Sequence, residues 1–306
     1  MDRRRLIGIG LVAVSACGFG SGAIFAKPVY AAGVDWLTLM AWRFLFGATL
    51  AWGGLLLSGV RRHALRRMTR RAVAVALALG ALYVGNSGTY FAGIETVPAS
   101  LAALVVYVYP ALVAVLTLRY GRRLSGRRAW AALGLALIGV ALALGGIEPT
   151  AAPPFLGLAL VVASPVIYAI WIVLSARLSG ERTDRVGHGS EVEADASPAT
   201  ALMMTTTAAV YWTVALAAGR PVLPAEVPTT AWTGILGVGV LATFVAIQTF
   251  YAGTRRMGAA QASLVSTIEP IWTITLAALM LHESLEPVQL AGGALILVGV
   301  LLAQTA

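Results

Sequence analysis

Long stretches with almost no charge recur along the whole chain, and each is long enough to form a helix that crosses a lipid bilayer. Such a helix needs about 20 predominantly apolar residues. Ten stretches qualify: Leu6–Ala26, Trp36–Ser58, Ala72–Gly93, Pro98–Leu118, Arg128–Gly145, Phe155–Ala176, Ala199–Ala218, Trp232–Ala252, Ala259–Leu281 and Val288–Gln304. They do not alternate apolar and polar residues as barrel strands do. In lipid, the backbone N–H and C=O groups must form their hydrogen bonds within the protein. The sequence therefore predicts an all-α membrane protein with ten transmembrane helices.

The composition excludes the main soluble classes. Hydrophobic residues make up 59% of the 306 residues and charged residues 11%, against about 45–50% and about 25% in soluble domains. A disordered chain, a secreted disulfide scaffold and an ordinary cytosolic enzyme are therefore excluded. The one cysteine, Cys17, allows neither an internal disulfide nor a cysteine metal cluster, and we expect no cofactor and no metal.

The positive charges predict the orientation of the chain in the membrane. With the N-terminus placed inside, 19 of the 22 lysines and arginines fall in inner segments. Lys27 and Arg220 fall outside, and Arg43 lies within a span. This asymmetry follows the positive-inside rule and predicts a multi-pass protein of the bacterial cytoplasmic (inner) membrane with both termini cytoplasmic. It also accounts for the net charge of +9 through contacts with membrane lipids, so no nucleic-acid partner is expected.

An internal repeat divides the chain into two halves. At a shift of 160 residues, Gly93 aligns with Gly253, Pro110 with Pro270 and Gly139 with Gly299. We therefore expect one five-helix repeat in residues 1–146 and a second in residues 147–306, with a cytoplasmic linker at 177–198 inside the second. Because five is odd, the second repeat enters the membrane from the opposite side. Such inverted repeats are typical of secondary transporters, whose binding site lies near the midplane between the halves.

The sequence resembles the drug/metabolite transporter superfamily, specifically its EamA-type members with two tandem five-helix repeats. The resemblance rests on Arg43 in WRFLFGATL, on the segment TFYAGTRRMGAAQASLVSTIEPIWTITLAALMLHE that runs from Thr249 to Glu283, and on LAGGALILVGVLLA after it. It implies transport of small molecules, with export common among such proteins. The family often carries an acid after the ninth helix, which is Glu283 here, whereas the first repeat has Arg123 at that register.

Two ionisable residues lie at depth in the predicted spans, and both need a partner or water. Glu269 precedes Pro270, which leaves the carbonyl of Ser266 without its helical hydrogen bond. Pro110 does the same in the matching helix, so helix breaks at corresponding depths indicate a central cavity. Glu269 then either binds a cationic group or a proton there, or has a structural role, possible partners including Arg43 in an ion pair. Arg43 itself fits a snorkelling or structural role.

Polar and aromatic side chains at depth are the further candidates for substrate contact. Asn86 and Gln248 should face inward because amide groups are costly in lipid, and residues three or four apart share a helix face. With Glu269, the candidate substrate-binding residues are Trp272, Asn86, Tyr83, Tyr90, Tyr109, Trp171, Gln248 and Tyr251. One acid among aromatic rings suits an amphipathic, amine-bearing molecule through cation–π contact.

These observations predict a secondary transporter, preferentially an exporter, of a small amino-acid-like or drug-like metabolite, driven by a proton or substrate gradient. The chain has a single lysine, Lys27, and therefore no Walker A lysine and no ATP site of its own. A homodimer is possible. A membrane-embedded enzyme is an alternative, but the three histidines fall in loops and no second carboxylate joins Glu269 at depth. A receptor or scaffold without transport is the other alternative.

Overall fold

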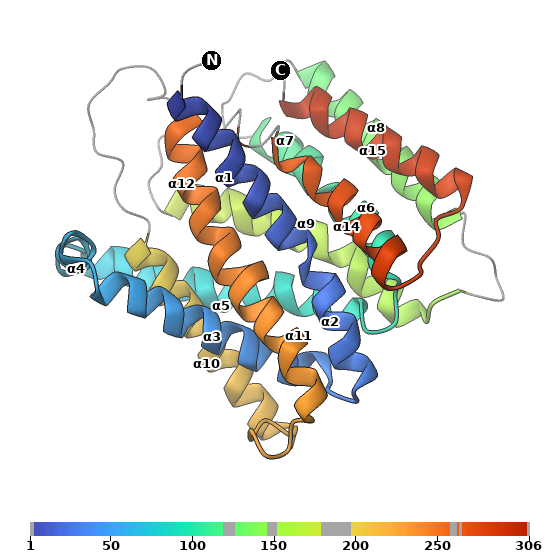
Figure 1. Cartoon of the computed structure of the whole chain (residues 1–306). Helices are drawn as coiled ribbons and strands as arrows, with labels where there is room; N and C mark the ends of the chain where they lie inside the picture. Colours follow the sequence, from blue (N-terminus) through green and yellow to red (C-terminus); the bar gives the residue numbers. More distant parts are fainter. Residues whose placement is uncertain are drawn as a thin grey trace.

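The structure is a computed structural model that describes residues 3–118, 126–145, 152–178, 197–257, 262 and 265–304 (Figure 1). Every regular element in these residues is helical, and no strand occurs among them. The first half holds α1 (Arg3–Gly20), α2 (Gly22–Ala31), α3 (Trp36–Leu56), α4 (Gly59–Arg66), α5 (Arg70–Gly93), α6 (Ala99–Val106), α7 (Tyr109–Leu118) and α8 (Gly126–Gly145). The second half holds α9 (Phe155–Leu178), α10 (Ser197–Ala217), η2 (Thr229–Ala231), α11 (Trp232–Leu236), the π-helix η3 (Gly237–Val245), α12 (Ala246–Met257), α14 (Ile268–Met280) and α15 (Pro287–Gln304).

The helices fall at the positions that the sequence predicts for the spans. Six helical stretches are long and apolar enough to cross a membrane: Arg3–Ala31, Trp36–Leu56, Arg70–Gly93, Phe155–Ser175, Ser197–Ala217 and Thr229–Thr254. Four shorter apolar helices complete the set: Ala99–Val113, Trp130–Leu144, Ile268–Met280 and Pro287–Leu302. The predicted all-α membrane class is therefore confirmed, with six candidate spans on length and composition. Part of the ninth predicted span, the middle of the linker and the boundary between the predicted domains lie outside the described residues.

Side-chain caps fix where several helices begin. Asp35 accepts hydrogen bonds from the backbone N–H groups of Leu37 (2.8 Å) and Thr38 (3.0 Å) at the start of α3. Thr69 accepts one from Ala72 N (3.1 Å) at the start of α5. Each cap satisfies backbone donors that have no partner within the helix, so these helices start where the apolar stretches start.

The helices that carry Pro110 and Pro270 are interrupted. α6 ends at Val106 and α7 begins at Tyr109, with Tyr107 and Val108 in a turn between them. In the second half, α14 begins at Ile268 after a turn at Thr267. Each proline thus lies in the first turn of the helix that follows the break, where its missing N–H costs that helix no hydrogen bond of its own.

The third predicted span of each half packs on the first predicted span of the other half, and a glycine permits each of these two contacts. A Cβ placed on Gly93 of α5 would lie 3.1 Å from the carbonyl oxygen of Gly157 on α9. A Cβ on Gly253 of α12 would lie 2.9 Å from the carbonyl oxygen of Gly8 on α1. The aligned glycines Gly93 and Gly253 therefore have the same packing role, since both let two backbones approach closely.

The last helices of the two halves, α8 and α15, pack on each other reciprocally and lie side by side in Figure 1. A Cβ on Gly139 would lie 2.5 Å from the carbonyl oxygen of Gly292, and a Cβ on Gly299 would lie 2.7 Å from that of Ala132. Residues 132 and 292 are themselves 160 apart, which is the shift of the sequence repeat. Position 139 of α8 thus meets position 292 of α15, and the equivalent position 299 of α15 meets the equivalent position 132 of α8.

Candidate functional site

The two helix breaks meet. The hydroxyl of Tyr107, in the turn between α6 and α7, donates a hydrogen bond to the carbonyl oxygen of Ser266 at 2.6 Å. Ser266 lies one residue before the turn at Thr267, and its carbonyl is the one that Pro270 leaves without a helical donor. Tyr107 is buried. A side chain from one broken helix therefore satisfies the backbone of the other.

Glu269 lies in the first turn of α14, directly after this junction. The residue is half-buried, so part of its surface remains accessible. Within the described part of the chain, its carboxylate accepts no hydrogen bond and forms no ion pair, and the bond recorded for this residue runs from Thr273 Oγ1 to its backbone oxygen (3.0 Å). An acid that has no partner among the described residues is available to bind a proton or a cation.

Five aromatic residues form a continuous group next to this acid, which we call the aromatic cluster: Tyr83, Tyr107, Tyr109, Tyr168 and Trp171. The shortest ring-centroid separations are 4.7 Å between Tyr109 and Tyr168 and 5.1 Å between Tyr83 and Trp171. Tyr107 joins at 5.9 Å from Tyr109. The carboxylate of Glu269 interacts electrostatically with all four tyrosines of the cluster. Rings from α5, α7 and α9 and the turn before α7 therefore lie within electrostatic range of the acid.

Hydrogen bonds hold α5 and α9 together along this group. Trp171 donates from Nε1 to the carbonyl oxygen of Leu79 (2.9 Å), and Ser164 Oγ donates to Asn86 Oδ1 (3.1 Å). The predicted residues Trp171 and Asn86 thus each bond across the contact between α5 and α9. Tyr90, farther along α5, is half-buried and interacts electrostatically with both Glu269 and Arg43.

Three other predicted residues, Trp272, Tyr251 and Gln248, lie on α14 and α12. Trp272 is 36% exposed and donates from Nε1 to Ser21 Oγ, between α1 and α2 (3.0 Å). Tyr251 is 43% exposed, pairs with Phe250 at 6.3 Å and also interacts electrostatically with Tyr168. Gln248 is half-buried on α12. Trp272 follows Glu269 by three residues on α14 and therefore lies on the same helix face as the acid.

Arg43 does not pair with Glu269. No ion pair within 4.0 Å involves either residue in the described chain. Arg43 Nε donates instead to Thr243 Oγ1 of η3 (2.8 Å), and its guanidinium carbon lies 4.5 Å from the ring centroid of Phe91 and 5.0 Å from that of Phe44. Within the π-helix, the Thr243 hydroxyl itself donates to Val238 O. This hydroxyl and the two rings are therefore the contacts of the guanidinium, where an acid was a possible partner.

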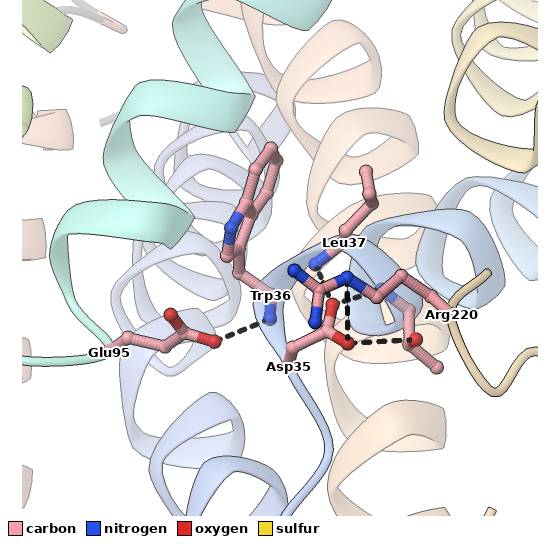
Figure 2. Close-up of polar contacts among 6 residues, drawn as sticks. Asp35, Trp36, Leu37, Glu95 and Arg220 are labelled. Atoms are coloured by element: carbon pink, nitrogen blue, oxygen red, sulfur yellow. Dashed lines mark hydrogen bonds and ion pairs between the residues drawn. The ribbon is translucent and has the colours of Figure 1, made fainter. Parts of the chain in front are cut away.

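Acids outside the spans connect the loops at the opposite end of the bundle from α4. Glu95 Oε1 accepts a hydrogen bond from Trp36 N (2.7 Å), and Arg220 Nε lies 3.9 Å from Asp35 Oδ2 (Figure 2). Burial raises the pKa of Glu95 above its ordinary value of 4.5, and the hydrogen bond from Trp36 N opposes that rise without cancelling it. Sequence reasoning missed these contacts, although an aspartate directly before a span is a recognisable helix cap.

Glu283 caps α6 from the other half of the chain. Its carboxylate accepts hydrogen bonds from Ala99 N (2.9 Å), Ser100 N (2.8 Å) and Ser100 Oγ (2.7 Å). The positive end of the helix favours an acid there. Arg123, which takes this register in the first repeat, lies outside the described residues. No cluster of three or more potential metal ligands occurs among the residues that the structure describes.

The sequence profile of the EamA-like transporter family matches the chain twice in tandem, over residues 6–145 and 155–305. The chain belongs to the EamA-like transporter family. A protein named "Uncharacterized transporter" from Archaeoglobus fulgidus is 28% identical over 221 residues, which are 70% of each protein. "Uncharacterized transporter YcbK" from Bacillus subtilis is 28% identical over 207 residues, and the match spans 66% of this chain and 62% of that protein. Both names agree with membership of the drug/metabolite transporter superfamily.

The fold also occurs in a solved structure. A crystal structure described only as "Crystal structure of protein" superposes with a TM-score of 0.64 at 20% identity, over 99% of this chain and 97% of that one. At this identity the likeness establishes the fold alone. Together, the family and the apolar helices show a membrane protein related to transporters, and they point away from an enzyme.

Proposed function

We propose that this chain is a secondary transporter that exports a small amino-acid-like or drug-like metabolite across the bacterial cytoplasmic membrane. The proposal rests on one observation above all: Glu269, an acid without a protein partner in the described chain, lies where the broken helices of the two halves meet and beside the aromatic cluster. A cationic group would find a carboxylate there together with aromatic faces that attract it.

The architecture that goes with this function has ten spans in two inverted repeats, residues 1–146 and 147–306, with both termini cytoplasmic. The reciprocal contacts of Gly139 and Gly299 support the relation between the halves, and the arginines of the inner segments support the orientation. The beginning of α1 and the end of α15 lie at the same end of the bundle in Figure 1, which agrees with an even number of crossings.

The orientation is tested by cysteine labelling in a Cys17→Ala background. Leu57, 88% exposed between α3 and α4, and Leu223, 56% exposed before η2, are suitable positions for single cysteines. A membrane-impermeant reagent should label the Leu57→Cys variant only from the cytoplasmic side and the Leu223→Cys variant only from the outside. Labelling of both from the same side would contradict the ten-span architecture.

Transport is tested with the purified chain in proteoliposomes. Uptake and efflux of a panel of amines, amino acids and neutral metabolites are measured with and without a pH gradient. The proposal predicts that at least one amine-bearing compound crosses the membrane without ATP. A membrane-embedded enzyme would instead convert a compound chemically, and a receptor or scaffold would bind without moving it, so both alternatives are separated in the same assay.

A further inference from the structure

The Arg43 guanidinium is a buried charge that has no counter-ion among the described residues. The side chain is 6% exposed on α3, and arginine keeps its proton in proteins. In the described chain no carboxylate lies within 4.0 Å of it. The hydroxyl of Thr243 and the faces of Phe44 and Phe91 hold the group in place, but none of them carries a negative charge. A cation that is held without being neutralised attracts an anion.

The guanidinium also retains unused donors. Nε donates to Thr243 Oγ1, and Nη1 has only the weakly accepting sulfur of Met40 at 3.9 Å. Among the described residues, Thr254 Oγ1 is the single fully buried side-chain nitrogen or oxygen that lacks a hydrogen-bond partner. Nη2, for which no partner is recorded, therefore still reaches accessible surface. Arginine presents its two terminal nitrogens as a fork that matches a carboxylate, and Nη2 is the donor of this fork that has no partner in the described chain.

Tyr83 and Tyr90 each lie within electrostatic range of both Arg43 and Glu269. Phe44, on which the guanidinium lies, also meets Tyr83 edge to face at a centroid separation of 6.0 Å. Ring contacts thus run from Tyr107, whose hydroxyl bonds to Ser266 three residues before Glu269, through Tyr109, Tyr168 and Tyr83 to Phe44 under the guanidinium.

We propose that Arg43 is an anion-binding subsite for a carboxylate of the transported molecule, so that the substrate is a small zwitterion with its cationic group at Glu269. This inference rests on the proposed function, because it assigns the second charge of the substrate at the same site. A charged hydrogen bond that is lost at a buried site weakens binding roughly tenfold or more, and the loss is confined to ligands that carry the anion.

Three probes with one carbon skeleton separate the two charges: leucine (zwitterion), isopentylamine (cation only) and isocaproate (anion only). Binding to the purified full chain is measured by intrinsic tryptophan fluorescence for the wild type and for Arg43→Gln, Arg43→Lys and Glu269→Gln. We expect the wild type to bind leucine more tightly than isopentylamine. Arg43→Gln should weaken leucine at least about tenfold and leave isopentylamine within about threefold. Arg43→Lys should keep part of the preference.

Thr243→Val is the second variant in case Arg43→Gln does not fold. It keeps the charge of Arg43 and removes the acceptor that orients it, so leucine should weaken severalfold and isopentylamine should not. The subsite is overturned if the wild type binds isopentylamine as tightly as leucine, if the Arg43 or Thr243 change weakens both probes equally, or if the wild type binds none of the three.

Different results would overturn the proposed transport function and the anion subsite. Binding of isopentylamine that Glu269→Gln abolishes, or transport of another amine in proteoliposomes, would leave the transporter standing without the anion subsite. Absence of transport for every amine-bearing compound in the panel would remove both.

Discussion

The hydroxyl of Tyr107 donates a 2.6 Å hydrogen bond to the carbonyl oxygen of Ser266 and thereby joins the break in one half of the protein to the break in the other. The two residues are 159 positions apart. The bond satisfies a backbone acceptor that a proline has deprived of its helical donor. Glu269, which has no partner among the described residues, follows the junction within one helical turn.

Tyr107→Phe removes this donor and keeps the ring. We expect a loss of about 1–2 kcal/mol in stability, because the carbonyl of Ser266 loses its partner, together with slower transport. Thermal unfolding in detergent and proteoliposome flux measure the two effects. Tyr109→Phe is the matched control, since no hydrogen bond is recorded for the hydroxyl of Tyr109 in the described chain. Equal stability of the two variants would contradict this role of Tyr107.

Pro110 and Pro270 should matter more for transport than for folding. Replacing either with alanine restores a backbone donor and allows the helix to continue through the break, so we expect transport to fall severalfold while membrane abundance changes little. Pro287→Ala is the control because Pro287 begins α15 without interrupting a helix. Undiminished flux in the Pro110→Ala/Pro270→Ala double variant would make the breaks irrelevant to transport.

The contact between α8 and α15 should be sensitive to one added methyl group on either side. Gly139→Ala and Gly299→Ala each place a Cβ less than 3.0 Å from a carbonyl oxygen of the facing helix. We expect each to destabilise the protein by about 1–3 kcal/mol, as overpacking does. A Cβ on Gly134, also in α8, meets nothing within 4 Å, so Gly134→Ala should be neutral or slightly stabilising. Thermal unfolding of the three variants decides the matter, and equal effects would disprove the close approach.

Glu95 should make stability depend on pH. Because burial raises its pKa in the folded protein above the ordinary value of 4.5, the favourable contribution of this carboxyl is fully present below the unfolded pKa and is lost as pH rises through the folded pKa. Glu95→Gln mimics the protonated form and can still accept from Trp36 N. It should therefore be more stable than the wild type above the folded pKa and no more stable at low pH.

Melting temperatures of wild type and Glu95→Gln over a pH series measure this difference, with Glu286→Gln as a control at an exposed acid. A stability gap that grows as pH falls would have the wrong sign for this account.

The parts of the fold that depend on backbone packing are predictable from the sequence. The repeat register pairs Gly93 with Gly253 and Gly139 with Gly299, and all four prove to be contact points between the halves, because a position where two helices touch tolerates only a small residue in both copies. The helices at the predicted spans follow from hydrophobicity alone.

Contacts that depend on helix rotation and on side-chain direction could not be predicted. Almost every face of these helices is apolar, so periodicity does not reveal which face is inward. The sequence therefore does not reveal that Trp272 donates to Ser21, and it offers Arg43 as a possible partner of Glu269, whereas Arg43 bonds to Thr243. The short helix α4 could not be predicted because only the cap at Ser58 marks its start.

The central claim is that Glu269 binds the cationic group or the proton that transport requires, and Glu269→Gln in proteoliposomes tests it most directly. The change keeps size and hydrogen-bonding capacity and removes only the charge, and Glu286→Gln makes the same change at an exposed acid as the control. Flux of an amine-bearing substrate is measured with and without a pH gradient for wild type and both variants. The account predicts that Glu269→Gln inserts normally and loses substrate flux or its dependence on pH, while Glu286→Gln retains both. Unchanged flux and unchanged pH dependence in a well-inserted Glu269→Gln variant would contradict it.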